Sequence, residues 1–252
     1  MLGLGVIGAA ILIAVLAPLI ATHSPFRSSI NFLQVASASH WLGTDVLGRD
    51  IFSRVVYGSR TSLTVGIGAA FVASLIGVPI GVIAGFFGGR VDVFFVQAID
   101  LFIALPGLVL ALIITAMVGP TLFNLVMILG FVMWPTVARL VRGQALAVRE
   151  SVFVEAARAL GGKPLWIIRK HILPNIVRIV AAQFAITVSF AIFTSASLSF
   201  LGLGIPPPTP DWGGMVRAGF DVLSIQPLVS LAPGAAVAFT VFGFYMIGTS
   251  VE

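Results

Sequence analysis

The sequence contains no cysteine, and only 9% of its 252 residues are charged. The absence of cysteine excludes disulfide bonds and thiolate metal sites, and it leaves the redox compartment of the protein open. Charged residues make up roughly 25% of an ordinary soluble domain, whereas 59% of this chain is hydrophobic. A water-soluble fold of this length needs far more polar surface. The composition therefore predicts an integral membrane protein.

Acidic residues are scarcer than basic ones, and the formal net charge is +5. A basic balance can indicate a nucleic-acid partner, but here the basic residues are few and scattered and form no face interleaved with aromatic residues. A membrane protein with positively charged cytoplasmic loops explains the same balance better. We therefore expect the lipid bilayer, and no nucleic acid, as a partner.

Six apolar segments are long enough to cross a bilayer. A helix rises 1.5 Å per residue, so about 20 residues cross about 30 Å of hydrocarbon. The first segment lacks a basic stretch ahead of it and has the length of a span, so we expect a retained helix rather than a signal peptide. Either the natural start lies upstream or terminal residues are missing from the chain. We predict one all-α, polytopic transmembrane domain over residues 1–252, with helices near 2–22, 62–87, 92–118, 121–143, 175–200 and 229–250.

The distribution of basic residues sets the orientation of these helices. If the N-terminus lies inside, nine basic residues fall on or beside the inner side and five fall outside. Lys and Arg are enriched in cytoplasmic loops. We therefore expect residues 23–61 to form an extracytoplasmic cap and residues 144–174 to form a cytoplasmic loop.

The second segment carries a small residue at every fourth position. This spacing places the small residues on one face of a helix, where another helix can approach closely. We expect this face to serve helix packing. The residues are Ala69, Ala73, Gly77, Gly81, Gly85 and Gly89.

Polar side chains inside the third and fifth segments are candidates for a substrate path. Asp100 lies within the third segment, and an acid inside the membrane is a functional hypothesis by default; an ion pair with one of the inner arginines is the structural alternative. Gln183, Thr187 and Ser189 lie in the fifth segment. Hydroxyl groups can instead bond to the backbone one turn back, and both alternatives stay open.

Residues 155–175 read EAARALGGKPLWIIRKHILPN and form the longest polar, patterned stretch. Ser151 is placed to cap a short helix over 152–160, Gly161 and Gly162 are placed to stop it, and Pro164 is placed to begin the next helix. The stretch resembles the EAA loop of the membrane subunits of ABC importers. That resemblance implies that the loop docks on an ATP-hydrolysing subunit through Glu155, Ala156, Ala157, Arg158 and Gly161.

Residues 40–66 contain His40, Asp45 and Asp50, whose side chains are possible metal ligands. Four convergent ligands are not evident, so we favour a folded cap held by Asp–Arg ion pairs and assign no metal site. The run HWLGTDVLGRDIFSRVVYGSRTSLTVG resembles the opening of permeases in the dipeptide, oligopeptide and nickel branch of ABC importers. That branch has an extracytoplasmic scoop here, which corresponds to residues 23–61.

Together these resemblances imply a type I ABC importer permease fold with six transmembrane helices and a cytoplasmic coupling helix. They imply import of di- or oligopeptides by alternating access across a bacterial cytoplasmic (inner) membrane, with nickel as the alternative substrate. The implied partners are a second, homologous permease, two ATP-binding subunits and an extracytoplasmic solute-binding protein. ATP and magnesium would bind to the partner ATPases. A secondary transporter that works alone is the alternative from another class.

Catalytic motifs are missing. Gly162-Lys163 is similar to the end of a P-loop, but Ala157 and Pro164 occupy positions that need Gly and Ser or Thr. HExxH, a Ser-His-Asp order and paired carboxylates are also missing. We therefore expect a non-catalytic subunit with no cofactor of its own.

Overall fold

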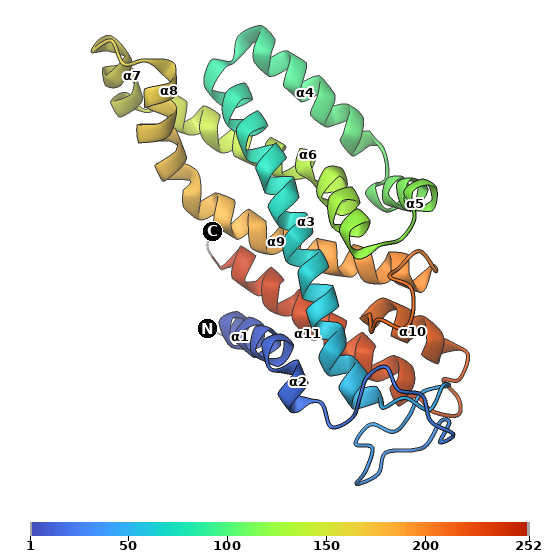
Figure 1. Ribbon diagram of the computed structural model, residues 1–252. Coiled ribbons are helices and arrows are strands. Elements are labelled where there is room, and N and C mark those ends of the chain that lie inside the picture. The colour runs from blue at the N-terminus through green and yellow to red at the C-terminus, as the bar shows by residue number, and fades with distance from the viewer. Residues whose placement is uncertain (1, 251–252) are drawn as a thin grey trace.

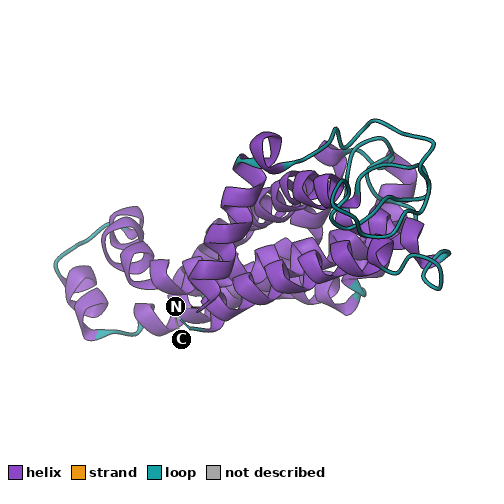
Figure 2. Ribbon diagram, turned by 90° about the horizontal axis from the view of Figure 1, so that it is seen from below, coloured by secondary structure: helices purple, strands orange, loops and turns teal. Residues whose placement is uncertain are grey.

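The computed structural model describes residues 2–250, which form an elongated helical assembly with long loops gathered at one end (Figures 1 and 2). No β-strand occurs among these residues, apart from an isolated bridge between Thr44 and Asp50. The helices are α1 (Leu2–Val15), α2 (Ala17–Ile20), α3 (Ile51–Phe87), α4 (Gly89–Ala104), α5 (Gly107–Val118), α6 (Leu122–Arg149), α7 (Val152–Ala159), α8 (Pro164–Ile167), a π-helical turn (Ile168–Ile172), α9 (Leu173–Phe200), α10 (Trp212–Phe220) and α11 (Leu228–Thr249).

The predicted membrane segments all appear as apolar helices, but not all as straight spans. Among the described residues, α3, α6, the continuous helix Pro164–Phe200 and α11 are long and apolar enough to cross a membrane. α4 and α5 are each too short to cross a membrane and reach that length only as a pair, which is bent by 81°. The first apolar helix, Gly3–Val15, is shorter than a full span.

Two predicted helices are interrupted, and proline explains both breaks. The helix predicted near 92–118 is broken at Pro106-Gly107, where these two residues predict an interruption: the chain is extended at Leu105, directly before Pro106, because a residue that precedes proline disfavours the helical conformation. The single helix expected over 2–22 is wrong. It ends at Val15, and the short α2 follows with Pro18 in its first turn, a position where proline's missing amide costs nothing.

Three helices extend further than the apolar pattern predicts. α3 begins at Ile51 rather than at 62, because the Asp50 side chain caps it by accepting a hydrogen bond from the Ser53 amide (2.8 Å). α6 continues to Arg149, and the helix ending at Phe200 begins at Pro164 rather than at 175. The polar ends of these helices therefore project beyond the apolar segments.

The centre of the assembly is the close packing of α3 on α6. A Cβ atom added to Gly77, Gly81 or Gly85 would lie only 2.6–2.7 Å from a backbone carbonyl oxygen of α6. The predicted small-residue face is therefore confirmed for these positions, and Ala69 and Ala73 are fully buried on α3. Gly89 does not belong to this face. It follows the end of α3 with a positive φ of 55°, and a Cβ there would meet nothing within 4 Å.

We expect Gly81→Ala to lower the unfolding temperature of the purified chain in detergent. The added methyl carbon would lie 2.6 Å from the carbonyl oxygen of Ala138, and over-packing of this kind typically costs about 1–3 kcal/mol. Gly143→Ala is the matched control, because the space around Gly143 on α6 is empty within 4 Å. Alanine in that helical position should be neutral or slightly stabilising. Equal unfolding temperatures for both variants and the wild type would contradict the close packing.

Candidate functional site

The short helix α7 lies at the end of the molecule opposite the long loops (Figure 1). Its C-terminus has the expected glycine stop: the Gly161 amide donates to the Arg158 carbonyl and the Gly162 amide donates to the Ala157 carbonyl, both at 2.9 Å. With φ +81° at Gly161, these bonds form a Schellman motif. The predicted cap by Ser151 is wrong, because the Ser151 hydroxyl donates backwards to the Val148 carbonyl. The helix therefore has a firmly defined end.

α7 packs on the membrane helices through a narrow inner face. Val154 is fully buried and Ala157 is 8% exposed, and both join a hydrophobic cluster with Phe86 of α3. Val137, Val141 and Ala145 of α6, and Ile167, Ile168, Ile172 and Ile176 around the start of α9, belong to the same cluster. The Arg158 guanidinium lies 5.2 Å from the centre of the Phe86 ring, in the range of a cation–π contact. These contacts fix α7 to the ends of α3, α6 and α9.

The outer face of α7 is exposed and partly apolar. Of the predicted coupling residues, Glu155, Ala156, Arg158 and Gly161 are exposed, whereas Ala157 faces the cluster. Sequence reasoning missed the large apolar side chains beside them, among which Val152 is 82% and Leu160 89% exposed. The sequence could have revealed these side chains, because they stand on or beside the polar side of an amphipathic helix. Exposed apolar residues gathered with charged ones are typical of a protein contact surface.

Two ion pairs join α4 to α6. Arg142 binds Asp92 through two hydrogen bonds, of which Nη2–Oδ2 measures 2.6 Å, and Arg139 pairs with Asp100. The fork geometry of Arg142 on Asp92 is the stronger kind of charged contact. Asp100 therefore has an arginine partner, as the structural alternative predicted, and its side chain remains 58% exposed.

The three polar candidates on α9 are buried and engaged within the chain. The Thr187 hydroxyl donates to the Gln183 carbonyl one turn back (2.8 Å), and the Gln183 amide reaches the Thr187 hydroxyl at 3.4 Å. Ser189 instead donates across to the Val241 carbonyl of α11 (3.2 Å). In this conformation their polar groups satisfy one another and the backbone.

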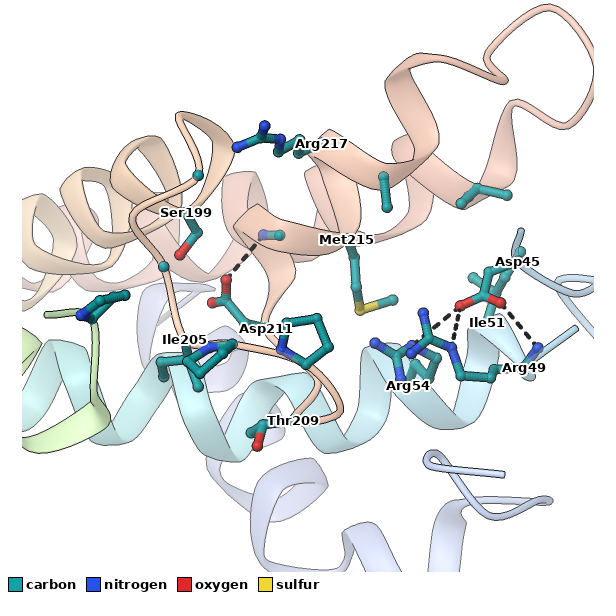
Figure 3. Close-up of a pocket in the computed structure, with 18 residues that line it drawn as sticks. Asp45, Arg49, Ile51, Arg54, Ser199, Ile205, Thr209, Asp211, Met215 and Arg217 are labelled. Atoms are coloured by element: carbon teal, nitrogen blue, oxygen red, sulfur yellow. Dashed lines mark hydrogen bonds and ion pairs between the residues drawn. The ribbon is translucent and has the colours of Figure 1, made fainter. Parts of the chain in front are cut away.

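A cavity of about 350 Å³ lies at the opposite end of the molecule, between the cap, the start of α3 and α10 (Figure 3). Asp45 enters it with two arginines, Arg49 at 2.8 Å and Arg54 at 3.5 Å. The predicted Asp–Arg pairs of the cap are therefore present. The three residues considered as metal ligands are not brought together, because Asp45 pairs with arginines while His40 binds Asp50.

Asp211 is a buried acid in this cavity that sequence reasoning missed, although an aspartate before Trp212-Gly-Gly is typical of a helix cap. Its Oδ2 accepts a hydrogen bond from the Gly214 amide (2.9 Å) and caps α10. Burial raises the pKa of the Asp211 carboxyl above its ordinary value, although the hydrogen bonds to it act in the opposite direction. Burial favours the neutral form because it removes water from the charge.

Comparisons with known proteins agree on one family. A family model described as "Binding-protein-dependent transport system inner membrane component" matches residues 77–251. A dipeptide transport system permease of Alkalihalophilus pseudofirmus is 41% identical over 99% of this chain and 83% of the relative. An oligopeptide transport system permease of Bacillus subtilis is 38% identical over 100% of this chain and 83% of the relative. An inward-facing structure of the MetNI methionine ABC transporter has a similar fold, with a TM-score of 0.63 at 20% identity over 80% of this chain and 98% of the other.

The raised pKa of Asp211 predicts that the stability of the folded protein depends on pH. An acid whose pKa is raised on folding binds its proton more tightly in the folded state, so stability is lost as pH rises from the ordinary pKa through the raised one. Asp211→Asn keeps the cap, because Asn also accepts at this position. We expect the unfolding temperature of the variant, relative to the wild type, to increase as pH rises above about 4. The exposed Asp221→Asn is the control. A difference for Asp211→Asn that does not vary with pH would contradict the assignment.

Proposed function

Because the chain belongs to the family of binding-protein-dependent transport system inner membrane components, we propose that it is the permease subunit of an ABC importer for di- or oligopeptides. It works by alternating access across a bacterial inner membrane. The substrate class follows the curated relatives, whose names specify dipeptide and oligopeptide transport. The nickel alternative has no such support among these relatives, and a secondary transporter working alone does not fit a family of multi-component systems.

The observation that carries the proposal is the geometry of α7. Its inner face is packed into a cluster shared by the ends of α3, α6 and α9, while its outer face presents Glu155, Ala156 and Leu160. A helix held in this way moves together with the membrane helices when a partner pushes it. We therefore propose that residues 144–174 are the coupling loop and that α7 docks on an ATPase subunit.

We propose a different role for Ala157 than for the other predicted coupling residues. It lies in the cluster beside Phe86 rather than on the outer face. Its small size lets α7 approach the membrane helices, whereas we propose that Glu155, Ala156, Arg158 and Gly161 meet the partner. The importer also needs a second permease, two ATP-binding subunits and an extracytoplasmic solute-binding protein. ATP and magnesium would bind to the ATPase subunits, and this chain would perform no catalysis.

The proposed substrate path runs along α9. Gln183, Thr187 and Ser189 are bonded internally in this conformation, so they would meet substrate only when α9 shifts against α11. Asp100 is the weaker candidate, because Arg139 already pairs with it. Residues 23–61 are proposed to be the scoop that receives substrate from the binding protein.

We expect Glu155→Lys and Gly161→Leu to leave the assembled importer in the membrane but to reduce ATP hydrolysis stimulated by substrate and binding protein. Leucine at Gly161 must adopt φ +81°, which costs a non-glycine residue roughly 1–2 kcal/mol and displaces the end of α7. Allosteric coupling of about 1–3 kcal/mol changes an affinity roughly 5- to 150-fold. We expect the stimulation of ATP hydrolysis to decrease by a factor within that range.

Two matched controls separate coupling from general damage. Glu150→Lys reverses an exposed charge that lies between α6 and α7 and pairs only with Arg149 among the described residues. Gly161→Asn keeps the left-handed conformation, which asparagine tolerates. Both controls should retain stimulation. Full stimulation in Glu155→Lys and Gly161→Leu would refute the coupling role of α7.

A further inference from the structure

Two histidines and one aspartate from separate stretches converge where α3 begins. His23 follows α2, His40 lies in the cap, and Asp50 caps α3. Nδ1 of His40 lies 2.8 Å from Oδ1 of Asp50, and Nδ1 of His23 lies 3.9 Å from the same oxygen. The two imidazole rings are tilted by 30° with centres 4.5 Å apart. One candidate ligand atom from each residue lies within 4.8 Å of the other two.

Asp50 is a buried carboxylate without an arginine or lysine partner in the part of the chain that the structure describes. Its side chain is 1% exposed, and its ion-pair partners there are the two histidines. The neighbouring Asp45 is also buried but is paired with Arg49 and Arg54. A buried negative charge is costly unless a cation or several hydrogen bonds compensate it. Hydrogen bonds compensate part of this charge, whereas a cation bound between the carboxylate and the imidazoles would also neutralise it.

The carboxylate is already oriented. Its Oδ2 accepts hydrogen bonds from the Ser53 amide (2.8 Å) and the Thr22 hydroxyl (3.5 Å), which leaves Oδ1 directed at the imidazoles. The His23 amide donates to the Ser53 hydroxyl (3.0 Å), so the same residue also holds the loop that carries His23. Partners of this kind fix the orientation of metal ligands in known sites.

We propose that His23, His40 and Asp50 bind a divalent transition-metal ion, with Zn²⁺ as the best fit. Two imidazole nitrogens and one carboxylate oxygen are donors that suit Zn²⁺ better than Ca²⁺ or Mg²⁺, which prefer oxygen alone. Bonds of about 2.1 Å in a tetrahedral site place ligand atoms about 3.4 Å apart, between the two Nδ1–Oδ1 distances found here. Three protein ligands leave the fourth position to water.

Metal at this site fastens the cap to the membrane domain. The three ligands belong to the end of the first helical region, the long loop and the start of α3, which lie far apart in the sequence but meet here. The ion enters from the solvent side, because the His23 side chain is 42% exposed while that of Asp50 is closed off. This role depends on neither the transported substrate nor the ATPase contact.

The test is zinc binding to the full chain, purified in detergent with a histidine-free affinity tag and stripped of metal. We expect the wild type to bind one Zn²⁺ and to unfold at a higher temperature with zinc. His23→Asn and His40→Asn should each lower the affinity by more than the roughly 10- to 100-fold that loss of an outer hydrogen-bond partner costs, and should abolish the shift. Co²⁺ bound to the wild type should show the visible absorption of a tetrahedral site.

The chain supplies its own matched control, because His171 is its only other histidine. His171→Asn removes the same side chain at the far end of the molecule and should bind zinc as the wild type does. The His23→Asn variant is expected to fold, because His23 is half-exposed and does not make the 2.8 Å contact with Asp50. A loss of zinc binding in this variant therefore cannot be attributed to misfolding. Absence of saturable zinc binding, or equal affinity in the wild type and His23→Asn, would overturn the proposal.

Discussion

The close packing of α3 on α6 is the constraint on which the other helices depend. Helices in lipid gain little from the hydrophobic effect, so their association relies on contacts that small residues permit. Gly77, Gly81 and Gly85 bring the backbone of α3 against successive carbonyl groups of α6. Each larger residue on this face would separate the two helices. The pair therefore acts as a fixed frame, on which α4 is held by the Asp92–Arg142 contact.

This frame connects the two functional ends of the molecule. At one end, α3 and α6 supply Phe86, Val141 and Ala145 to the cluster that holds α7. At the other end, Asp50 caps α3 and binds His40 of the cap, and Arg54 of α3 lines the cavity. If an ATPase subunit pushes α7 as proposed, the push is transmitted along helices that also carry the proposed extracytoplasmic cap. Because the same helices reach both ends, a movement at one end would change the geometry at the other, as the proposed alternating access requires.

Features encoded in neighbouring residues could be predicted from the sequence. The apolar segments, the small-residue face and the Gly161–Gly162 stop each depend on local spacing, and the structure contains all three. Features that depend on distant partners could not. The burial of Ala157 and the approach of His23 to Asp50 arise only when separate stretches fold together. The break at Pro106 follows from the sequence, whereas the angle of 81° between α4 and α5 comes only from the structure.

The most direct measurement is chemical cross-linking from a single cysteine, because the native chain has none. Leu160→Cys places the probe on the outer face of α7, and Phe123→Cys places a probe with comparable exposure at the opposite end of α6. In the assembled importer, the account predicts that Leu160→Cys cross-links to an ATPase subunit and Phe123→Cys does not. Failure at Leu160, or equal cross-linking from both positions, would contradict docking through α7.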